Sequence, residues 1–256
     1  MEKQLAALAA TEEERMLLVR VCDQLTRAER KNQPASTFFL TPRERALAAQ
    51  LLPQARFFGG VEDAERTVAF WLPEYLEAEE YFQDGPVACL HAAFYESNAL
   101  THRDVLGALM GAGLRRDAIG DIYVGENECD FFVLSELTAY LLDNLTSAGR
   151  SALRVERRSL DQVQRPPQKL REQRVTVSSM RLDGILASAF HLSRADAVQA
   201  IHAGRVTRND LPCLKPDRLL EQGDVIALRG KGKLKLLALG GETKKGRQAV
   251  NIGIYE

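Results

Sequence analysis

The sequence predicts an α+β protein built from three small domains and a linker. In some stretches apolar residues recur with the 3.6-residue period of helices, and in others they form the short runs typical of strands. Segments rich in proline, glutamine and charge interrupt both patterns. We therefore place an N-terminal α+β domain at residues 1–78, a middle domain at 79–158, a linker at 159–174 and a C-terminal α/β domain at 175–256.

Two helices are predicted in the N-terminal domain. Thr11 begins the first as an N-cap followed by three glutamates, and Asn32-Gln33-Pro34 ends it. Thr41 and Pro42 begin the second, with threonine as N-cap and proline at the first helical position, and Pro53 ends it. Each helix therefore has both a start and a stop signal.

Residues 56–58 and 67–72 are predicted to be two strands that flank a glycine-containing turn. A group of acidic residues follows them. It could be a metal or acid–base cluster, but a solvated helix face is the better interpretation, because charge runs usually face water. The group comprises Glu74, Glu77, Glu79 and Glu80.

The middle domain shows the element order β-α-β-β-α-β. This order is typical of the ferredoxin-like fold, which RNA-recognition modules adopt with base-stacking aromatic residues on two strands. A fold does not by itself define a function. The predicted elements are a strand at 87–92, a helix at 101–111, strands at 121–124 and 129–134, a helix at 135–145 capped by Ser135, and a strand at 153–156.

Two features of this domain have competing interpretations. Phe131 and Phe132 lie where an RNA-recognition module would carry stacking rings, but the surrounding residues are acidic and apolar, so we expect core packing. His102 and Asp104 could form an acid–base pair. Their place in a first helical turn after Thr101 favours a capping role for the aspartate.

Charge divides the chain. Residues 1–149 hold 13 Lys and Arg against 24 Asp and Glu, a net charge of −11, and residues 150–256 hold 21 against 11, a net charge of +10. The basic part predicts a nucleic-acid partner, although many proteins have patchy surfaces. In the acidic part, Arg115 and Arg116 could contact phosphate or lie in a solvated loop, and the sequence does not favour either.

The composition is that of a soluble globular protein. The absence of a run of about 18 apolar residues predicts no membrane span, and the first residues lack the pattern of a secretory signal. Cys22, Cys89, Cys129 and Cys213 are far apart and form no C-x-x-C pair. We therefore expect reduced thiols in a cytoplasmic protein, without a disulfide framework or a metal site.

In the C-terminal domain, two short helical patterns precede short strands. Ser193 is predicted to cap the second helix, and Gly204 to end it in the left-handed conformation. Residues 205–210 and 225–228 are predicted strands. Basic residues lie at helix starts and turns, where side chains and backbone N–H groups can bind phosphate together.

These residues carry a resemblance to a known RNA-binding module. The motifs Arg181-Leu182-Asp183, Ser193-Arg194, Gly204-Arg205-Val206, Asn209 and Gly223-Asp224 resemble the S-four RNA-binding domain, named for a protein of the small ribosomal subunit. The resemblance covers roughly residues 174–240. It implies that two helices and a strand present a basic face to structured RNA.

The resemblance also assigns roles to individual residues. Asp183 is expected to support the fold, since a carboxylate repels phosphate, and Gly204 is expected to support it as the helix stop. Asn209-Asp210 departs from the Asn-Gly of many such domains, which makes the tight turn less favourable. Arg229, Lys231, Lys233 and Lys235 are expected to form a basic strand edge. The expected RNA contacts are Arg181, Ser193, Arg194, Arg205, Arg208, Asn209, Lys215, Arg229, Lys231, Lys233 and Lys235.

Upstream motifs extend the resemblance to nearly the whole chain. Thr101 to Met110, Ile119 to Ile122, Ala28 to Lys31 and Phe57 to Gly60 look like the YlmH-type family. That family implies a non-catalytic factor without cofactors. It would bind large-subunit rRNA and tRNA on stalled large ribosomal subunits, in ribosome-associated quality control or rescue.

Two other functions are weighed against this one. Arg181-Leu182-Asp183 also resembles a signature of pseudouridine synthases, which would make the chain an RNA-modifying enzyme. In this sequence the tripeptide opens the RNA-binding module, and no second copy precedes it. A scaffold linked to cell division, with a protein partner for residues 1–150, is the third hypothesis.

Overall fold

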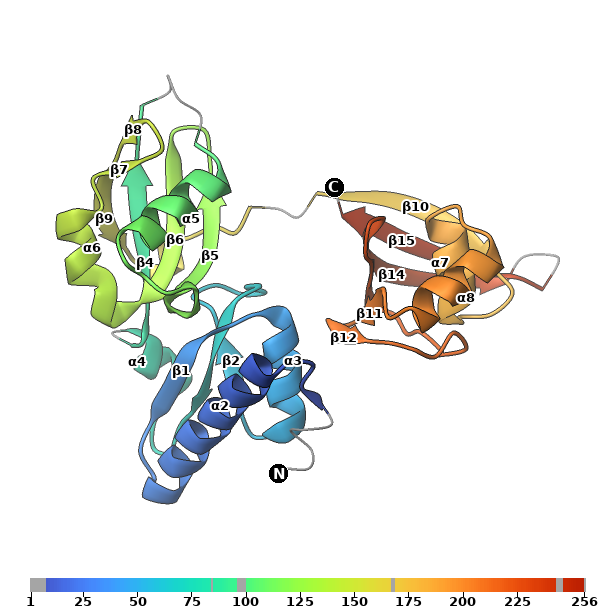
Figure 1. The fold of residues 1–256 in the computed structure, drawn as a ribbon, viewed down its shortest axis with the longest axis horizontal. Helices are drawn as coiled ribbons and strands as arrows, with labels where there is room; N and C mark the ends of the chain where they lie inside the picture. The colour runs from blue at the N-terminus through green and yellow to red at the C-terminus, as the bar shows by residue number, and fades with distance from the viewer. Residues whose placement is uncertain (1–7, 84, 96–99, 167–168, 243–245, 256) are drawn as a thin grey trace. The chain divides into compact units, whose positions relative to one another are not determined.

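The computed structural model divides the chain into two compact units, Met1–Pro166 and Pro167–Glu256 (Figure 1). No helix among the described residues is long and apolar enough to cross a membrane. The structure describes residues 8–83, 85–95, 100–166, 169–242 and 246–255.

Helices α2 (Glu12–Lys31) and α3 (Pro42–Leu51) begin as their sequences predict. The Thr11 side chain accepts a hydrogen bond from the backbone of Glu14, and Asn32 ends α2 in the left-handed conformation. Thr41 and Glu44 form a complete capping box at α3. The start and stop signals of both helices are thus confirmed.

A three-stranded antiparallel sheet packs beside these helices in the order β1-β3-β2. Its strands are β1 (Ala35–Leu40), β2 (Arg56–Phe58) and β3 (Thr67–Trp71). We did not predict β1, which pairs along β3. The short helix α4 (Ala78–Gln83) follows and buries Phe82. The four acidic residues expected to face water, Glu74, Glu77, Glu79 and Glu80, are all exposed.

The middle part of the first unit forms an antiparallel sheet in the order β5-β6-β4-β9. Helices α5 and α6 contribute to one hydrophobic core with this sheet, and a two-stranded hairpin of β7 (Ser147–Ala148) and β8 (Ser151–Ala152) precedes the last strand. The main elements are β4 (Val87–Ala93), α5 (His102–Gly111), β5 (Ile119–Val124), β6 (Glu128–Leu134), α6 (Thr138–Asn144) and β9 (Arg154–Arg158).

The capping role expected for Ser135 is wrong. Ser135–Leu137 is a 3₁₀ turn, and α6 begins after it without a side-chain cap. The Ser135 hydroxyl instead donates to the carbonyl of Gly85, and its backbone N–H donates to that of Pro86. Both bonds hold the end of β6 against the start of β4, and the hydroxyl is therefore not available to the helix.

A buried arginine joins the N-terminal and middle parts into one unit. The Arg66 guanidinium donates to the carbonyls of Phe39, Arg116 and Ile119 at 3.2, 3.1 and 2.9 Å. Asp121 accepts the backbone N–H of Arg66 at 2.9 Å. Burial and the nearby Arg116 lower the pKa of Arg66 to about 10. The arginine therefore satisfies carbonyls that the packed seam would leave without donors.

The second unit is a six-stranded antiparallel sheet in the order β10-β15-β14-β13-β11-β12, and α7 and α8 pack on one of its faces (Figure 1). Residues 170–174, which we placed in the linker, belong to β10. The elements are β10 (Leu170–Val177), α7 (Leu182–Ala189), α8 (Arg194–His202), β11 (Val206–Arg208), β12 (Leu211–Pro212), β13 (Val225–Leu228), β14 (Gly232–Glu242) and β15 (Gln248–Tyr255).

Candidate nucleic-acid interface

Asp183, in the first turn of α7, is the centre of a charged cluster. Its side chain is only 2% exposed. Arg181 donates to its two carboxylate oxygens at 3.1 and 3.0 Å, and Arg194 donates from Nε and an Nη at 3.2 and 3.1 Å. Two arginines from the starts of two helices therefore converge on one buried carboxylate. The Arg194 side chain is 59% exposed, so its remaining donors face solvent.

The two arginines also decide the ionisation of Asp183. Burial raises the pKa of the carboxyl group, but the hydrogen bonds from Arg181 and Arg194 lower it more, and the net pKa is below the ordinary value. The group is thus ionised at neutral pH. One negative charge meets two positive charges, and the cluster keeps a net positive charge toward solvent.

The start of α7 does not offer backbone donors to an anion, which differs from our expectation. The N–H groups of Leu182 and Asp183 donate to the carbonyls of Arg218 and Pro216 at 2.9 and 3.0 Å. The N–H of Gly184 donates to the Asp183 carboxylate at 2.8 Å. The loop that carries Arg218 covers this helix end, so a phosphate here would meet side chains alone.

Ser193 caps α8. Its hydroxyl oxygen accepts the N–H of Asp196 at 3.0 Å and the hydroxyl donates to the Asp196 carboxylate at 2.7 Å. The capping prediction is confirmed. These bonds occupy the hydroxyl, and direct RNA contact by Ser193 remains a prediction.

A second buried carboxylate organises the strand β11. Asp224 accepts hydrogen bonds from Arg208 Nε at 2.8 Å, from the Asn209 amide at 2.8 Å and from the backbone of Glu221 at 2.8 Å. Burial raises its pKa, but these bonds lower it more, and the net pKa is lowered. Arg208 is largely buried, with 16% of its side chain exposed. Both predicted RNA contacts are therefore engaged in holding the sheet together.

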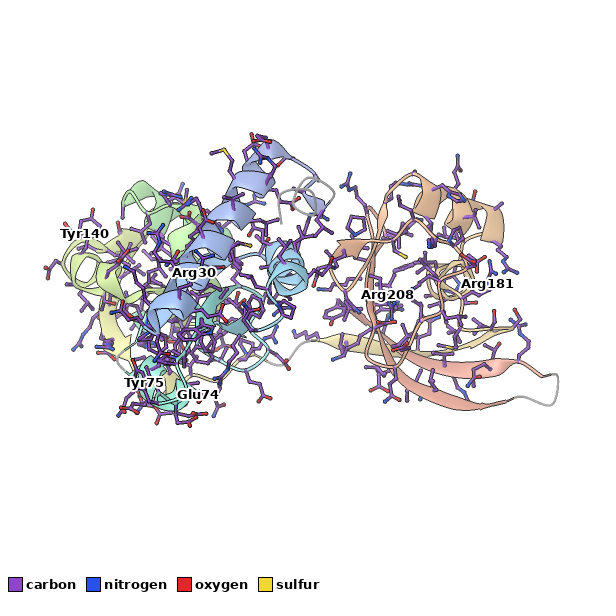
Figure 2. The ribbon with its side chains drawn as sticks, turned by 90° about the horizontal axis from the view of Figure 1, so that it is seen from below. Arg30, Glu74, Tyr75, Tyr140, Arg181 and Arg208 are labelled. Atoms are coloured by element: carbon purple, nitrogen blue, oxygen red, sulfur yellow. The ribbon has the colours of Figure 1, made fainter. Side chains whose placement is uncertain are left out.

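Figure 2 labels Arg181 and Arg208, which lie at separate places on the second unit. The turn after Arg208 forms despite its departure from Asn-Gly. Asn209 and Asp210 both adopt positive φ, at 50° and 66°, as a two-residue hairpin turn requires. The side-chain carbonyl oxygen of Asn209 accepts the N–H of Val225 at 2.9 Å, which fixes the first turn residue.

A third group of basic residues surrounds the end of α8. Gly204 ends the helix at φ +66°, as predicted. The N–H of Arg229 donates to the carbonyl of Arg205 at 2.9 Å, which brings these two exposed arginines together. Lys231 lies in the same tight turn between β13 and β14 and is exposed. Exposed Lys215 lies apart from this group, in the loop that covers α7.

The expectation of a basic strand edge is wrong. Lys233 and Lys235 lie on β14, which pairs with β13 on one side and β15 on the other. Sequence reasoning also did not single out Arg218, an exposed residue of the loop across α7. The available signal was that Arg218 follows Lys215 closely in the sequence, in the same predicted loop before Leu219.

The middle domain buries the residues that could have been stacking platforms. Phe131 and Phe132 are both fully buried, which confirms their core assignment. Phe131 packs with the helices, and Phe132 packs with Phe39 and Val68 of the N-terminal part. The sheet surface around Phe132 is therefore closed by the chain itself.

Other candidate residues of the first unit are explained by local structure. Asp104 accepts the N–H of Thr101 at 2.9 Å, completing a capping box, so its capping role is confirmed. Arg115 pairs with Asp117, and Arg116 donates to the carbonyl of Ile119 at 2.7 Å. Among the described residues, no group of three His, Cys, Asp or Glu is placed to hold a metal ion.

Comparison with known proteins adds a family to this geometry. Residues 94–162 match a family model described as "Putative RNA-binding domain in YlmH". The chain is 32% identical over 219 residues to the Ribosome-associated protein quality control protein P2 of Bacillus subtilis (strain 168), and the match covers 84% of each chain. The chain belongs to the YlmH family.

A solved structure shows a similar fold. It is the Cell division protein ylmH from Streptococcus pneumoniae, with a TM-score of 0.51 and 19% sequence identity. The match covers 61% of this chain and 98% of that one. The YlmH resemblance drawn from the sequence motifs is thus confirmed, and the mixed α+β fold class with it.

Proposed function

We propose that this YlmH-family chain is a non-catalytic RNA-binding factor that acts on the large ribosomal subunit in protein quality control. The relative's name and the matched domain support association with ribosomes and RNA. In this proposal the middle part is a ferredoxin-like domain, and the second unit is an S-four-type module that contacts structured rRNA and tRNA.

The convergence of Arg181 and Arg194 on buried Asp183 is the observation that carries the proposal. The carboxylate fixes both guanidinium groups and leaves a net positive charge at the protein surface. Planar guanidinium groups can bind phosphate oxygens in pairs, which suits an RNA backbone. Exposed Arg205 and Arg229 extend the same chemistry along α8.

The geometry of Asp183 also disfavours the enzyme hypothesis. A catalytic aspartate needs an oxygen that can reach a substrate. Both oxygens of Asp183 accept hydrogen bonds from arginines, and the side chain is almost fully buried. This arrangement supports a positioning role for the Arg-Leu-Asp tripeptide.

Co-sedimentation with purified large ribosomal subunits tests the proposal. Arg194→Ala with Arg205→Ala should weaken binding by roughly tenfold or more, because charge-assisted hydrogen bonds to phosphate are lost. The slope of log affinity against log salt should become shallower by about 1.5, since each lost phosphate contact removes about 0.7 to 0.9.

Arg27→Ala with Arg30→Ala supplies the matched control. These arginines are exposed on α2 of the acidic first unit, where Figure 2 labels Arg30. The control removes the same charge and should leave binding and its salt slope unchanged. Equal binding by the wild-type chain and the Arg194/Arg205 variant would refute the proposal.

A further inference from the structure

The second unit has a sheet face that α7 and α8 do not cover. Leu234 and Leu236 of β14 point into the core beneath the helices. Side chains alternate along a strand, so Lys233 and Lys235 point to the opposite side. We call this side the open face, and define it by Glu172 and Arg174 of β10, Lys233 and Lys235 of β14, and Tyr255 of β15.

The neighbours of the two lysines are small or apolar. Lys235 lies between Val225 of β13 and Gly253 of β15, and Lys233 lies beside Ala227. The side chains of Leu170 and Leu237 lie over Gly253, 3.2 and 3.3 Å from where its Cβ would be. The two lysines are partly exposed and reach past this apolar surface. Lys233 Nζ lies 5.1 Å from the centre of the Tyr255 ring, a contact that positions the ammonium group.

The open face has an excess of positive charge, with Arg174, Lys233 and Lys235 against Glu172. Among the described strand residues in register with the two lysines, the acidic one is Glu172. It pairs with Gly253, which pairs in turn with Lys235. In the described part of the chain, no carboxylate forms an ion pair with Arg174, Lys233 or Lys235. On the helix side, by contrast, Arg181, Arg194 and Arg208 are each bound to a buried carboxylate.

We infer that the open face binds the phosphate backbone of a second RNA segment, separate from the one at α7 and α8. The inference rests on the proposed RNA-binding function. Lysine ammonium groups suit a phosphate backbone because they act as point charges without a fixed donor geometry. The sheet and the two helices separate the open face from the surface at α7 and α8. A single short RNA segment therefore cannot contact both surfaces, and the second unit would hold two segments together.

Stoichiometric titration of the full chain with a short fluorescein-labelled RNA hairpin tests this inference. With the hairpin well above its dissociation constant, Lys233→Ala with Lys235→Ala should bind one hairpin fewer than the wild type. The salt slope of the total binding should fall by about 1.5 for two lost phosphate contacts. Lys233→Arg with Lys235→Arg keeps the charge and should match the wild type.

The second arm uses Arg194→Ala with Arg205→Ala, which should also lose one hairpin. Loss in this arm together with an unchanged count and salt slope for the Lys233/Lys235 alanine variant would overturn the inference and leave the proposed function standing. A wild-type chain that binds no hairpin and no large subunits would overturn both. Far-UV circular dichroism checks that both variants are folded. Folding of the Lys233/Lys235 variant is expected because these lysines are partly exposed and lie outside the hydrophobic core.

Discussion

At the scale of single residues, Asp183 and Asp224 perform the same task in two places. Each is buried, and each binds arginine. Asp183 holds two arginines whose donors extend to the surface, whereas Asp224 holds Arg208 within the sheet. An exposed-looking arginine in the sequence can therefore be a structural residue, and its carboxylate partner decides which role it has.

Acid should destabilise the second unit. The pKa values of Asp183 and Asp224 are lower in the folded chain than in the unfolded chain. Their stabilising contribution is therefore complete above the unfolded value near 4, and is lost as the pH falls through the lower folded value. Hydrogen exchange of peptides from β13 and β14, followed from pH 6 to pH 2.5, should show this loss of protection.

Asp183→Asn with Asp224→Asn removes both titrating groups. The double variant should be less stable at pH 6, because the arginines around the two buried carboxylates lose their counter-charge, and its stability should depend less on pH between 5 and 2.5. A wild-type pH profile in the double variant would show that other carboxylates cause the acid sensitivity.

At the scale of elements, two glycines differ in the space beside their Cα atoms. A Cβ added at Gly120 of β5 would lie 2.7 Å from the Phe39 ring and 2.9 Å from Cβ of Phe132. A Cβ added at Gly107 of α5 would meet nothing within 4 Å. The same substitution should therefore have opposite effects at these two positions.

Gly120→Ala should destabilise the first unit by about 1 to 3 kcal/mol, because it overpacks the seam between β1 and β6. Gly107→Ala should stabilise it by about 0.5 to 1 kcal/mol, because alanine favours a helix. Urea unfolding monitored by fluorescence of Trp71, the single tryptophan, measures both. A destabilised Gly107→Ala variant would be incompatible with the open space beside this residue of α5.

The elements that the sequence predicted are those with local signals. Caps at Thr11, Thr41, Thr101 and Ser193 are decided by a few neighbouring residues, and all four formed. The strand β1 was missed because its apolar residues do not alternate regularly. Its burial comes from α2 and β3, which no local pattern reveals.

The strand β10 was missed for the opposite reason. Its sequence, Leu-Arg-Glu-Gln-Arg-Val-Thr-Val, is mostly polar because one face is open and one edge is unpaired in the described sheet. Among the candidate RNA contacts, the sequence identified the basic residues but not their partners. Asp183 lies beneath a loop that is distant in the chain from α7, at Arg218, and Asp224 binds Arg208, which is 16 residues away in the sequence.

At the scale of the whole molecule, the two units differ in charge. The first, residues 1–166, holds 18 Lys and Arg against 26 Asp and Glu, a net charge of −8, and the second holds 16 against 9, a net charge of +7. By charge, phosphate should therefore bind to the second unit more strongly than to the first, although residues 94–162, which match the RNA-binding family model, lie in the first unit.

Bound RNA should raise the unfolding midpoint of the second unit more than that of the first. A ligand at 100 times its dissociation constant stabilises its site by about 2.7 kcal/mol. In urea with the RNA hairpin present, hydrogen exchange in β14 should slow, while the midpoint of the Trp71 transition should shift less. A matching shift in Trp71 would show that RNA also binds the first unit.

The pairing of Arg181 and Arg194 with Asp183 has a consequence for the speed of RNA release. Ordering a long side chain at an interface costs about 0.5 to 1.5 kcal/mol, and here that entropy is lost during folding, before RNA arrives. A chain with preorganised arginines should therefore keep its RNA longer than one whose arginines must be ordered on contact. The buried aspartate, which touches no phosphate, would then set the residence time of the complex.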